Sequence, residues 1–183
     1  PNLKQFSLPL KSVDDALNIR NEIDEIFARK KEKEKINIVV GGGGFTGCEL
    51  AGELVGYLRT LGNIHTHKQN DVNLSIVEAS SVLINGASRS VQQVAERKLR
   101  SLGVNIYLNS KIINVSESTL FAQPHLVLPF DLLVWTAGIR SNILVDRLTG
   151  VHTEKTCLIV DKSLKVIPLK NVSTTGQYSG NSD

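Results

Sequence analysis

The chain has 183 residues, of which 41% are hydrophobic and 21% charged, as in ordinary globular proteins. A length of this order suits one domain with its own core. The formal net charge of +3 is too small and too scattered to indicate nucleic-acid binding. No apolar run approaches the roughly 18 residues that a membrane span needs, and no signal peptide is visible, so we expect a cytoplasmic protein.

The chain begins with one expected helix. Ser12 precedes apolar residues that mostly recur at helical spacing, and Asp15 stands at the capping-box position. The helix leads into a run of mixed charge at residues 29–35, which we interpret as a solvated helix end. We therefore expect residues 1–34 to form a connector.

A glycine turn follows a short buried strand. Residues 36–40 form a mostly apolar, β-branched run without helical period, as in a strand that is buried on both faces of a parallel sheet. Gly42, Gly44 and Gly47 then follow in the order G-x-G-x-x-G, ahead of a helix expected at about 46–61. The first glycine allows a tight turn, the second a close approach to phosphate, and the third close helix packing.

The spacing of this motif predicts a dinucleotide site. The pyrophosphate would lie at the helix N-terminus, where N–H groups and the helix dipole favour negative charge. We expect the cofactor to contact every residue of the turn and helix start, namely Gly42, Gly43, Gly44, Phe45, Thr46 and Gly47.

The next strand, residues 72–77, ends at Glu78. A carboxylate there can accept hydrogen bonds from the adenosine ribose hydroxyls and would repel a 2′-phosphate, which favours NAD over NADP. Glu78 stands further from the glycines than is usual, and we attribute the excess to an exposed polar loop at 62–71. His65 and His67 in this loop lack further ligands that the sequence can place, so we expect no metal site.

The remaining segments complete an α/β fold. A helical stripe at 91–102 ends at Gly103, and four short β-like segments at 104–108, 111–115, 118–122 and 125–128 predict an antiparallel meander. The meander would cross over to a last parallel strand at 132–135. The fold class is thus a Rossmann-like parallel sheet with a β-meander crossover, of the inserted-domain type, with short helical and β flanks.

Two stretches carry a family resemblance. Residues 42–54 read GGGFTGCELAGEL, and residues 131–140 read DLLVWTAGIR. In these motifs the chain resembles the type II, non-proton-pumping NADH:quinone dehydrogenases, which belong to the two-dinucleotide-fold flavoprotein reductases. The resemblance implies an NADH domain at 35–150 inserted into an FAD domain, with a β arm and truncated FAD-domain remnant at 151–183.

The resemblance also implies roles for three further residues. Glu49 would reach the nicotinamide end of the cofactor as the catalytic residue, although helix N-terminal carboxylates are also common because they complement the dipole. Ala137 and Gly138 would let the backbone approach the cofactor in the same crevice as Gly44, the alternative for Gly138 being a simple turn.

The flavin half of such an enzyme is not expected in this chain. No second glycine fingerprint precedes Gly42, and Gln177 stands where the family closes its FAD site with an acid, so whether the parent keeps FAD is open. We expect the chain alone to bind NAD(H) without FAD and without turnover. Pro1 and the absence of methionine indicate an excised domain or a proteolytic product.

The parent would pass a hydride from NADH to FAD and then electrons to a quinone. Its expected partners are NADH, the missing FAD domain, the quinone and, as an open question, a second copy in a homodimer. The parent would be peripheral on the cytoplasmic or matrix face of a membrane. Two alternatives stay open: a domain of another NADH-dependent flavoprotein reductase, and a non-enzymatic NADH/NAD sensor. Cys48 and Cys157 lie far apart, which disfavours a thiol–disulfide reductase and fits a reducing compartment.

Overall fold

The computed structural model describes residues 2–65, 71–138, 143–154 and 157–168. The chain forms two compact units, residues 1–137 and 138–183. This division differs from the predicted boundaries at 34 and 150, because the first long helix packs into the core of the first unit and that unit ends with its last strand. How the parent protein is divided into domains stays a prediction.

The first unit is built around a five-stranded sheet in which every neighbouring pair is parallel. In spatial order its strands are β1 (Leu8–Pro9), β8 (Leu132–Trp135), β2 (Ile36–Gly41), β3 (Val72–Val77) and β4 (Asn105–Tyr107). The central strands β2, β3 and β8 confirm the strands predicted at 36–40, 72–77 and 132–135.

Both faces of this sheet are buried. Side chains alternate between the faces of a strand, and those of β2 divide accordingly: Ile38 and Val40 join one hydrophobic cluster, while Val39 joins another. Leu133 of β8 belongs to the cluster of Val39, and its neighbours Leu132 and Val134 belong to the cluster of Ile38. Two clusters on one sheet explain why successive residues are apolar at 38–40 of β2 and at 132–135 of β8.

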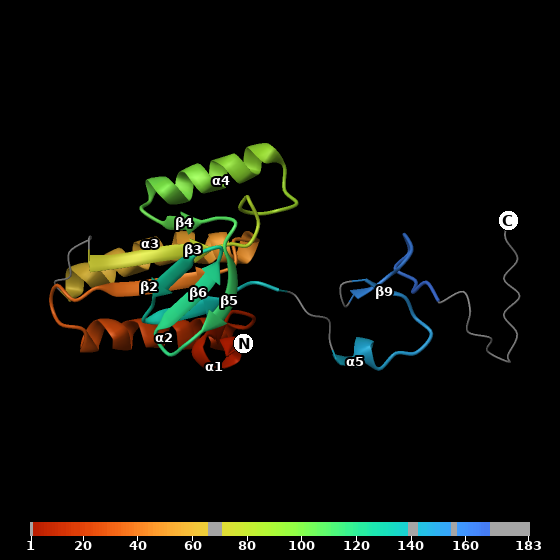
Figure 1. Ribbon diagram of the computed structural model, residues 1–183, viewed down its shortest axis with the longest axis horizontal. Coiled ribbons are helices and arrows are strands. Elements are labelled where there is room, and N and C mark those ends of the chain that lie inside the picture. The colour runs from red at the N-terminus through yellow and green to blue at the C-terminus, as the bar shows by residue number, and fades with distance from the viewer. Residues whose placement is uncertain (1, 66–70, 139–142, 155–156, 169–183) are drawn as a thin grey trace, which may run out of the picture. The chain divides into compact units, whose positions relative to one another are not determined.

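Helices cover the face that carries Ile38 and Val40. They are α2 (Val13–Arg29), α3 (Phe45–Ile64) and α4 (Arg89–Ser101), and a short α1 (Leu3–Phe6) precedes β1 (Figure 1). The predicted capping box of α2 is confirmed, since Ser12 Oγ accepts from Asp15 N and the Asp15 carboxylate accepts from Ser12 N. The backbone N–H of Lys11 and the Ser12 contacts also lower the pKa of Asp15. Gly103 follows α4 with φ +91°, as expected of a C′ residue.

A three-stranded antiparallel meander covers the other face, with strands β5 (Lys111–Val115), β6 (Thr119–Gln123) and β7 (Leu126–Pro129). Figure 1 shows β5 and β6 crossing over the parallel strands, and Leu120 and Ala122 of β6 share the cluster of Val39. The prediction that residues 104–108 belong to the meander was wrong. Ile106 of β4 pairs with Ile76 of β3, because burial in the helix-side core fixes this segment as the parallel edge.

The predicted loop at 62–71 was also wrong in its first part. Helix α3 continues through Asn63 and Ile64, because the buried Leu61 and Gly62 keep its last turn against the core. His65 ends the helix, and its ring lies 6.0 Å from that of Phe27 between ring centroids. Asp71 is buried and forms an ion pair with Lys35 at 3.6 Å. His67 lies outside the described residues.

The second unit contains α5 (Ile143–Asp146), β9 (Thr153–Glu154) and β10 (Cys157–Leu158), the two strands pairing antiparallel. Val160 forms an isolated bridge with Val166, and Ile167 N donates to Ile159 O at 3.0 Å. Residues 158–160 and 165–167, which belong to the β arm predicted within 151–183, therefore pair with each other. Gln177 lies outside the described residues.

Candidate functional site

The strand order of the parallel sheet creates a switch point beside β2. The chain runs from β2 to β3 and then to β4 on one side, and it returns through the meander to β8 on the other side of β2. In open α/β sheets, ligands bind outside the carboxyl ends of the strands at such a point. Gly41 ends β2 and Trp135 ends β8, and the two residues are register partners.

The glycine turn after β2 is held tightly against the end of β8. Gly42 has φ +114°, and a Cβ at Gly42 would lie 2.7 Å from Ala137 Cβ. Thr136 Oγ1 donates to the carbonyl oxygens of Gly41 and Gly42 at 3.2 and 3.1 Å. A Cβ at Gly47 would lie only 2.0 Å from Gly42 O, so α3 can approach the turn only with glycine there. Gly42 and Gly47 are thus required by backbone geometry.

Gly44 stands in a different environment. It is exposed, it has φ −72° as the N-cap of α3, and a Cβ there would meet no atom of its described surroundings within 4 Å. The first intrahelical hydrogen bond runs from Cys48 N to Gly44 O at 3.0 Å. The N–H groups of residues 45–47 precede this bond, which makes the start of α3 a place where an anion can accept backbone hydrogen bonds.

Glu78 lies at the end of β3 and reaches back to the glycine turn. Its Oε2 accepts from Gly43 N at 2.6 Å, and its Oε1 accepts from Ser80 N at 2.7 Å. Its own backbone is bonded to the end of β4, with Glu78 N donating to Tyr107 O and Ser110 N donating to Glu78 O. The carboxylate therefore stands beside the turn in a fixed orientation and is still partly exposed.

Cys48 lies beneath the turn, with its Sγ 3.4 Å from Gly43 O, to which the thiol donates. Burial raises the pKa of the Cys48 thiol to about 11, and the carboxylates of Glu78 and Glu49 act in the same direction. The side chain therefore remains a neutral thiol at neutral pH and can donate a hydrogen bond.

This pKa predicts how the two cysteines react with iodoacetamide. At pH 8 a thiol with this pKa is ionised to only about one part in a thousand, so we expect alkylation at the exposed Cys157 well before Cys48. The rate at Cys48 should rise about tenfold per pH unit between pH 8 and pH 10, because the thiolate is the nucleophile. Mass spectrometry of timed samples measures both rates. Equal rates at pH 8 would contradict the raised pKa.

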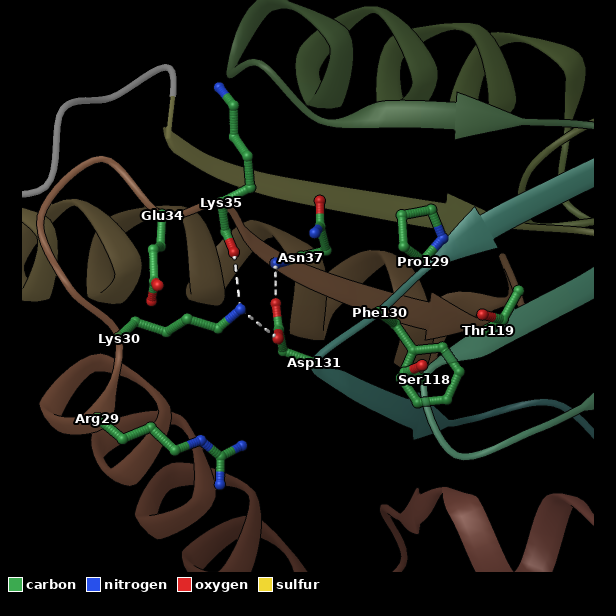
Figure 2. A pocket seen from close by; sticks show the side chains of 10 residues that line it. All are labelled: Arg29, Lys30, Glu34, Lys35, Asn37, Ser118, Thr119, Pro129, Phe130 and Asp131. Atoms are coloured by element: carbon green, nitrogen blue, oxygen red, sulfur yellow. Dashed lines mark hydrogen bonds and ion pairs between the residues drawn. The ribbon is translucent and has the colours of Figure 1, made fainter.

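The opposite end of the sheet has a pocket of about 550 Å³ (Figure 2). Lys30 at the end of α2 forms an ion pair with Asp131 at 2.8 Å, and it also donates to Lys35 O at 3.1 Å. The second carboxylate oxygen of Asp131 accepts from Asn37 N at 2.8 Å. Figure 2 shows the Lys30 ammonium group and the backbone N–H of Asn37 converging on the Asp131 carboxylate. These contacts join the end of α2 to the beginnings of β2 and β8.

Most of the predicted site residues lie at the switch point. Gly42, Gly43, Gly47 and Ala137 are packed together there, Glu78 contacts Gly43, and Gly44, Phe45 and Thr46 form the exposed rim of the helix start. Glu49 is exposed and lies one residue beyond the first turn of α3, because the helix begins at Phe45, within one residue of the start predicted at about 46. Gly138 is exposed with φ +80° and belongs to the second unit, so its place in the same crevice stays a prediction.

The sequence reasoning missed three contributors to the turn. Thr136 ties β8 to Gly41 and Gly42 through its hydroxyl. Gly41 makes room for the ring of Trp135, whose Cε3 would lie 2.7 Å from a Cβ at that position. Ile84 donates its N–H to Gly43 O at 2.7 Å. The run of consecutive glycines that begins at Gly41 could have pointed to Gly41 itself. The contributions of Thr136 and Ile84 could not be predicted, because these residues reach the turn from distant segments of the chain.

The parallel sheet, its switch point and the glycine turn before α3 define a Rossmann-type fold. The pyridine nucleotide-disulphide oxidoreductase family model matches residues 4–180. The chain belongs to this family.

Relatives of known activity are similar over most of this chain. The mitochondrial external alternative NAD(P)H-ubiquinone oxidoreductase B3 of Arabidopsis thaliana is 25% identical over 191 aligned residues, which cover 96% of this chain and 33% of the relative. The type II NADH:quinone oxidoreductase of Haemophilus influenzae is 28% identical, over 76% of this chain and 32% of its own length. The chain thus spans about a third of these proteins.

A solved structure confirms the fold. NDH2 from Plasmodium falciparum in complex with NADH superposes with a TM-score of 0.73 at 20% identity, covering 80% of this chain and 33% of that one.

Within the described part of the chain, no helix has the length and hydrophobicity to cross a membrane. The same residues contain no cluster of three or more histidine, cysteine or acidic side chains suited to a metal ion.

Proposed function

We propose that this chain binds NADH at the carboxyl end of β2 and is the NADH-binding part of a flavin-dependent NADH:quinone oxidoreductase. The observation that carries the proposal is Gly44, where exposed backbone with open space around it begins a helix at the switch point of a parallel sheet. The relatives' names, NAD(P)H-ubiquinone and NADH:quinone oxidoreductase, support the same activity.

In this proposal, different residues bind the pyrophosphate, the adenosine ribose and the nicotinamide end of the dinucleotide. The pyrophosphate lies on the N–H groups of residues 44–47, and the Glu78 carboxylate accepts from the adenosine ribose. Phe45 and Thr46 border the phosphates, and Ala137 forms the wall behind Gly42. Glu49 contributes toward the nicotinamide end, and its exposed carboxylate leaves it able to contact a ligand.

The chemistry of the whole protein is that of its cofactors. A flavin held by the remainder of the protein supplies the two-electron acceptor for NADH and the donor for the quinone. The residues of this chain bind and orient the dinucleotide, which requires no acid–base catalyst in the chain. Partners in the whole protein are therefore the flavin-binding part and the quinone, and a peripheral location on a membrane follows from the quinone.

Titration calorimetry with NADH tests the proposal. Gly44→Val places a branched side chain where the phosphates would lie, and since nothing described lies within 4 Å of a Cβ there, the fold should tolerate it. We expect the affinity for NADH to fall at least tenfold, with a loss of stability of about 1 kcal/mol or less from the changed N-cap. Gly56→Val is the matched control, because Gly56 is exposed in the same helix and equally unobstructed. A folded Gly44→Val variant that binds NADH normally would refute the site.

The choice between NADH and NADPH tests the role of Glu78. Glu78→Arg replaces the carboxylate with a cation that can pair with a 2′-phosphate, so the ratio of the NADPH to the NADH affinity should rise at least tenfold. Glu78→Gln keeps an acceptor for the N–H of Gly43 or Ser80 without the charge, and it should shift the ratio less. Both ratios come from titrations at one ionic strength. An unchanged ratio in the arginine variant would exclude Glu78 as the ribose ligand.

A further inference from the structure

The segment after Glu78 contains a strained residue that contacts the glycine turn. Ile84 has φ +51°, in the left-handed region that β-branched residues rarely adopt, and its side chain is only 6% exposed. Its neighbour Leu83 is 1% exposed, and Leu83 Cδ2 would lie 2.6 Å from a Cβ at Gly43. Such strain persists only where the surrounding packing fixes it, and it is concentrated at functional sites.

The strained conformation directs one hydrogen bond. Ile84 N donates to Gly43 O at 2.7 Å, and from below the turn the Cys48 thiol donates to the same oxygen at 3.4 Å. The other groups of the turn are also held, with Gly43 N donating to Glu78 and Gly42 O accepting from Thr136. The peptide that joins Gly43 to Gly44 is therefore fixed through its carbonyl oxygen.

This fixed oxygen determines where the next N–H points. In a planar trans peptide the C=O and N–H bonds point in opposite directions. Because Gly43 O faces Ile84 N and the Cys48 thiol, the N–H of Gly44 points away from these two groups, and Gly44 itself is exposed. Without these two donors, the peptide could rotate and turn its carbonyl dipole toward a bound anion.

We infer that Ile84 and Cys48 are positioning residues for the pyrophosphate: by holding Gly43 O, they aim the N–H of Gly44 at the phosphate. This inference rests on the proposed NADH site, and it adds residues outside the glycine motif to it. Neither residue touches the dinucleotide in this arrangement. Their effect should therefore appear only with ligands that carry phosphate groups at this position.

The test compares NADH with adenosine, which lacks the pyrophosphate, on the full chain. Replacing the backbone amide of Ile84 by an ester removes the N–H donor and keeps the side chain. We expect the affinity for NADH to fall about tenfold and that for adenosine, followed by NMR titration, to change less than twofold. The matched control is an ester at Ala87, which removes a bond of the same segment, Ala87 N to Ile84 O at 3.0 Å, that does not reach the turn.

Cys48 provides a second, independent arm. Cys48→Ala removes the thiol donor and should weaken NADH binding about threefold, while Cys48→Ser keeps a donor and should restore it to within twofold. Thermal denaturation establishes that each variant is folded. If the Ile84 ester does not fold, the comparison of Cys48→Ala with Cys48→Ser tests the positioning role. Equal losses for NADH and adenosine, or unchanged NADH binding in both arms, would overturn the positioning role. A wild-type chain that does not bind NADH would instead refute the proposed function.

Discussion

Gly47→Ala is expected to lower the free energy of unfolding by about 3 kcal/mol. The added Cβ would lie 2.0 Å from Gly42 O and 2.8 Å from Thr136 Oγ1, so either α3 or the turn must move. The nearest atoms belong to the backbone of Gly42, and the Thr136 hydroxyl is itself held by hydrogen bonds to Gly41 O and Gly42 O, so neither contact is easily relieved. Urea denaturation followed by circular dichroism measures the loss, and NADH binding should weaken in the same variant because the turn is displaced.

The matched control for this change is Gly56→Ala in the same helix. Gly56 is exposed and a Cβ there meets no described atom within 4 Å, so alanine should stabilise the protein by up to about 1 kcal/mol through its higher helix propensity. If the free energy of unfolding falls in Gly47→Ala and rises in Gly56→Ala, the loss at Gly47 comes from steric contact and not from helix propensity. A Gly47→Ala variant as stable as the wild type would show that α3 does not pack on the turn as described.

Asp131→Ala should cost about 3 kcal/mol of unfolding free energy at the other end of the sheet. The substitution leaves Lys30, whose side chain is only 25% exposed, without its carboxylate partner, and it also removes the acceptor of Asn37 N. A half-buried ammonium group would lose its carboxylate partner and a backbone N–H would lose its acceptor, and such losses cost more than an exposed ion pair gains. Urea denaturation again measures the loss, and NADH affinity should stay within twofold of the wild type.

Glu22→Ala is the corresponding control. Glu22 pairs with Arg29 at 3.7 Å, but the two side chains are 37% and 59% exposed, so the loss should not exceed about 0.5 kcal/mol. If the Asp131 variant loses no more stability than this control, the contacts among Lys30, Asn37 and Asp131 do not hold α2 to the sheet.

The sequence was most informative where burial dictates residue type directly. The runs at 36–40 and 132–135 could be predicted as central strands because a strand covered on both faces is apolar at successive residues, as at 38–40 and 132–135. Gly42 and Gly47 were identified from the spacing of the glycine motif, and the structure leaves no room for a side chain at either position. The acid at the end of the next strand, Glu78, was found from its position in the pattern and does lie beside the turn.

The errors and omissions all involve contacts between distant segments. A short segment such as Asn105–Tyr107 has no local feature that distinguishes a parallel edge from a meander strand, because its pairing with β3 is set by the core. The left-handed conformation of Ile84 runs against the preference of its residue type and is imposed by its burial beside Leu83.

Strand β2 carries a structural cluster at its first residues and the glycine turn at its last. Asn37 and Gly42 are separated by five residues of extended chain, which corresponds to roughly 17 Å. Substitutions this far apart with no shared partner usually combine additively. Substitutions at the pocket around Asp131 can therefore change the free energy of unfolding without altering cofactor preference. The cofactor end can likewise be redesigned in a chain that has first been stabilised at the opposite end.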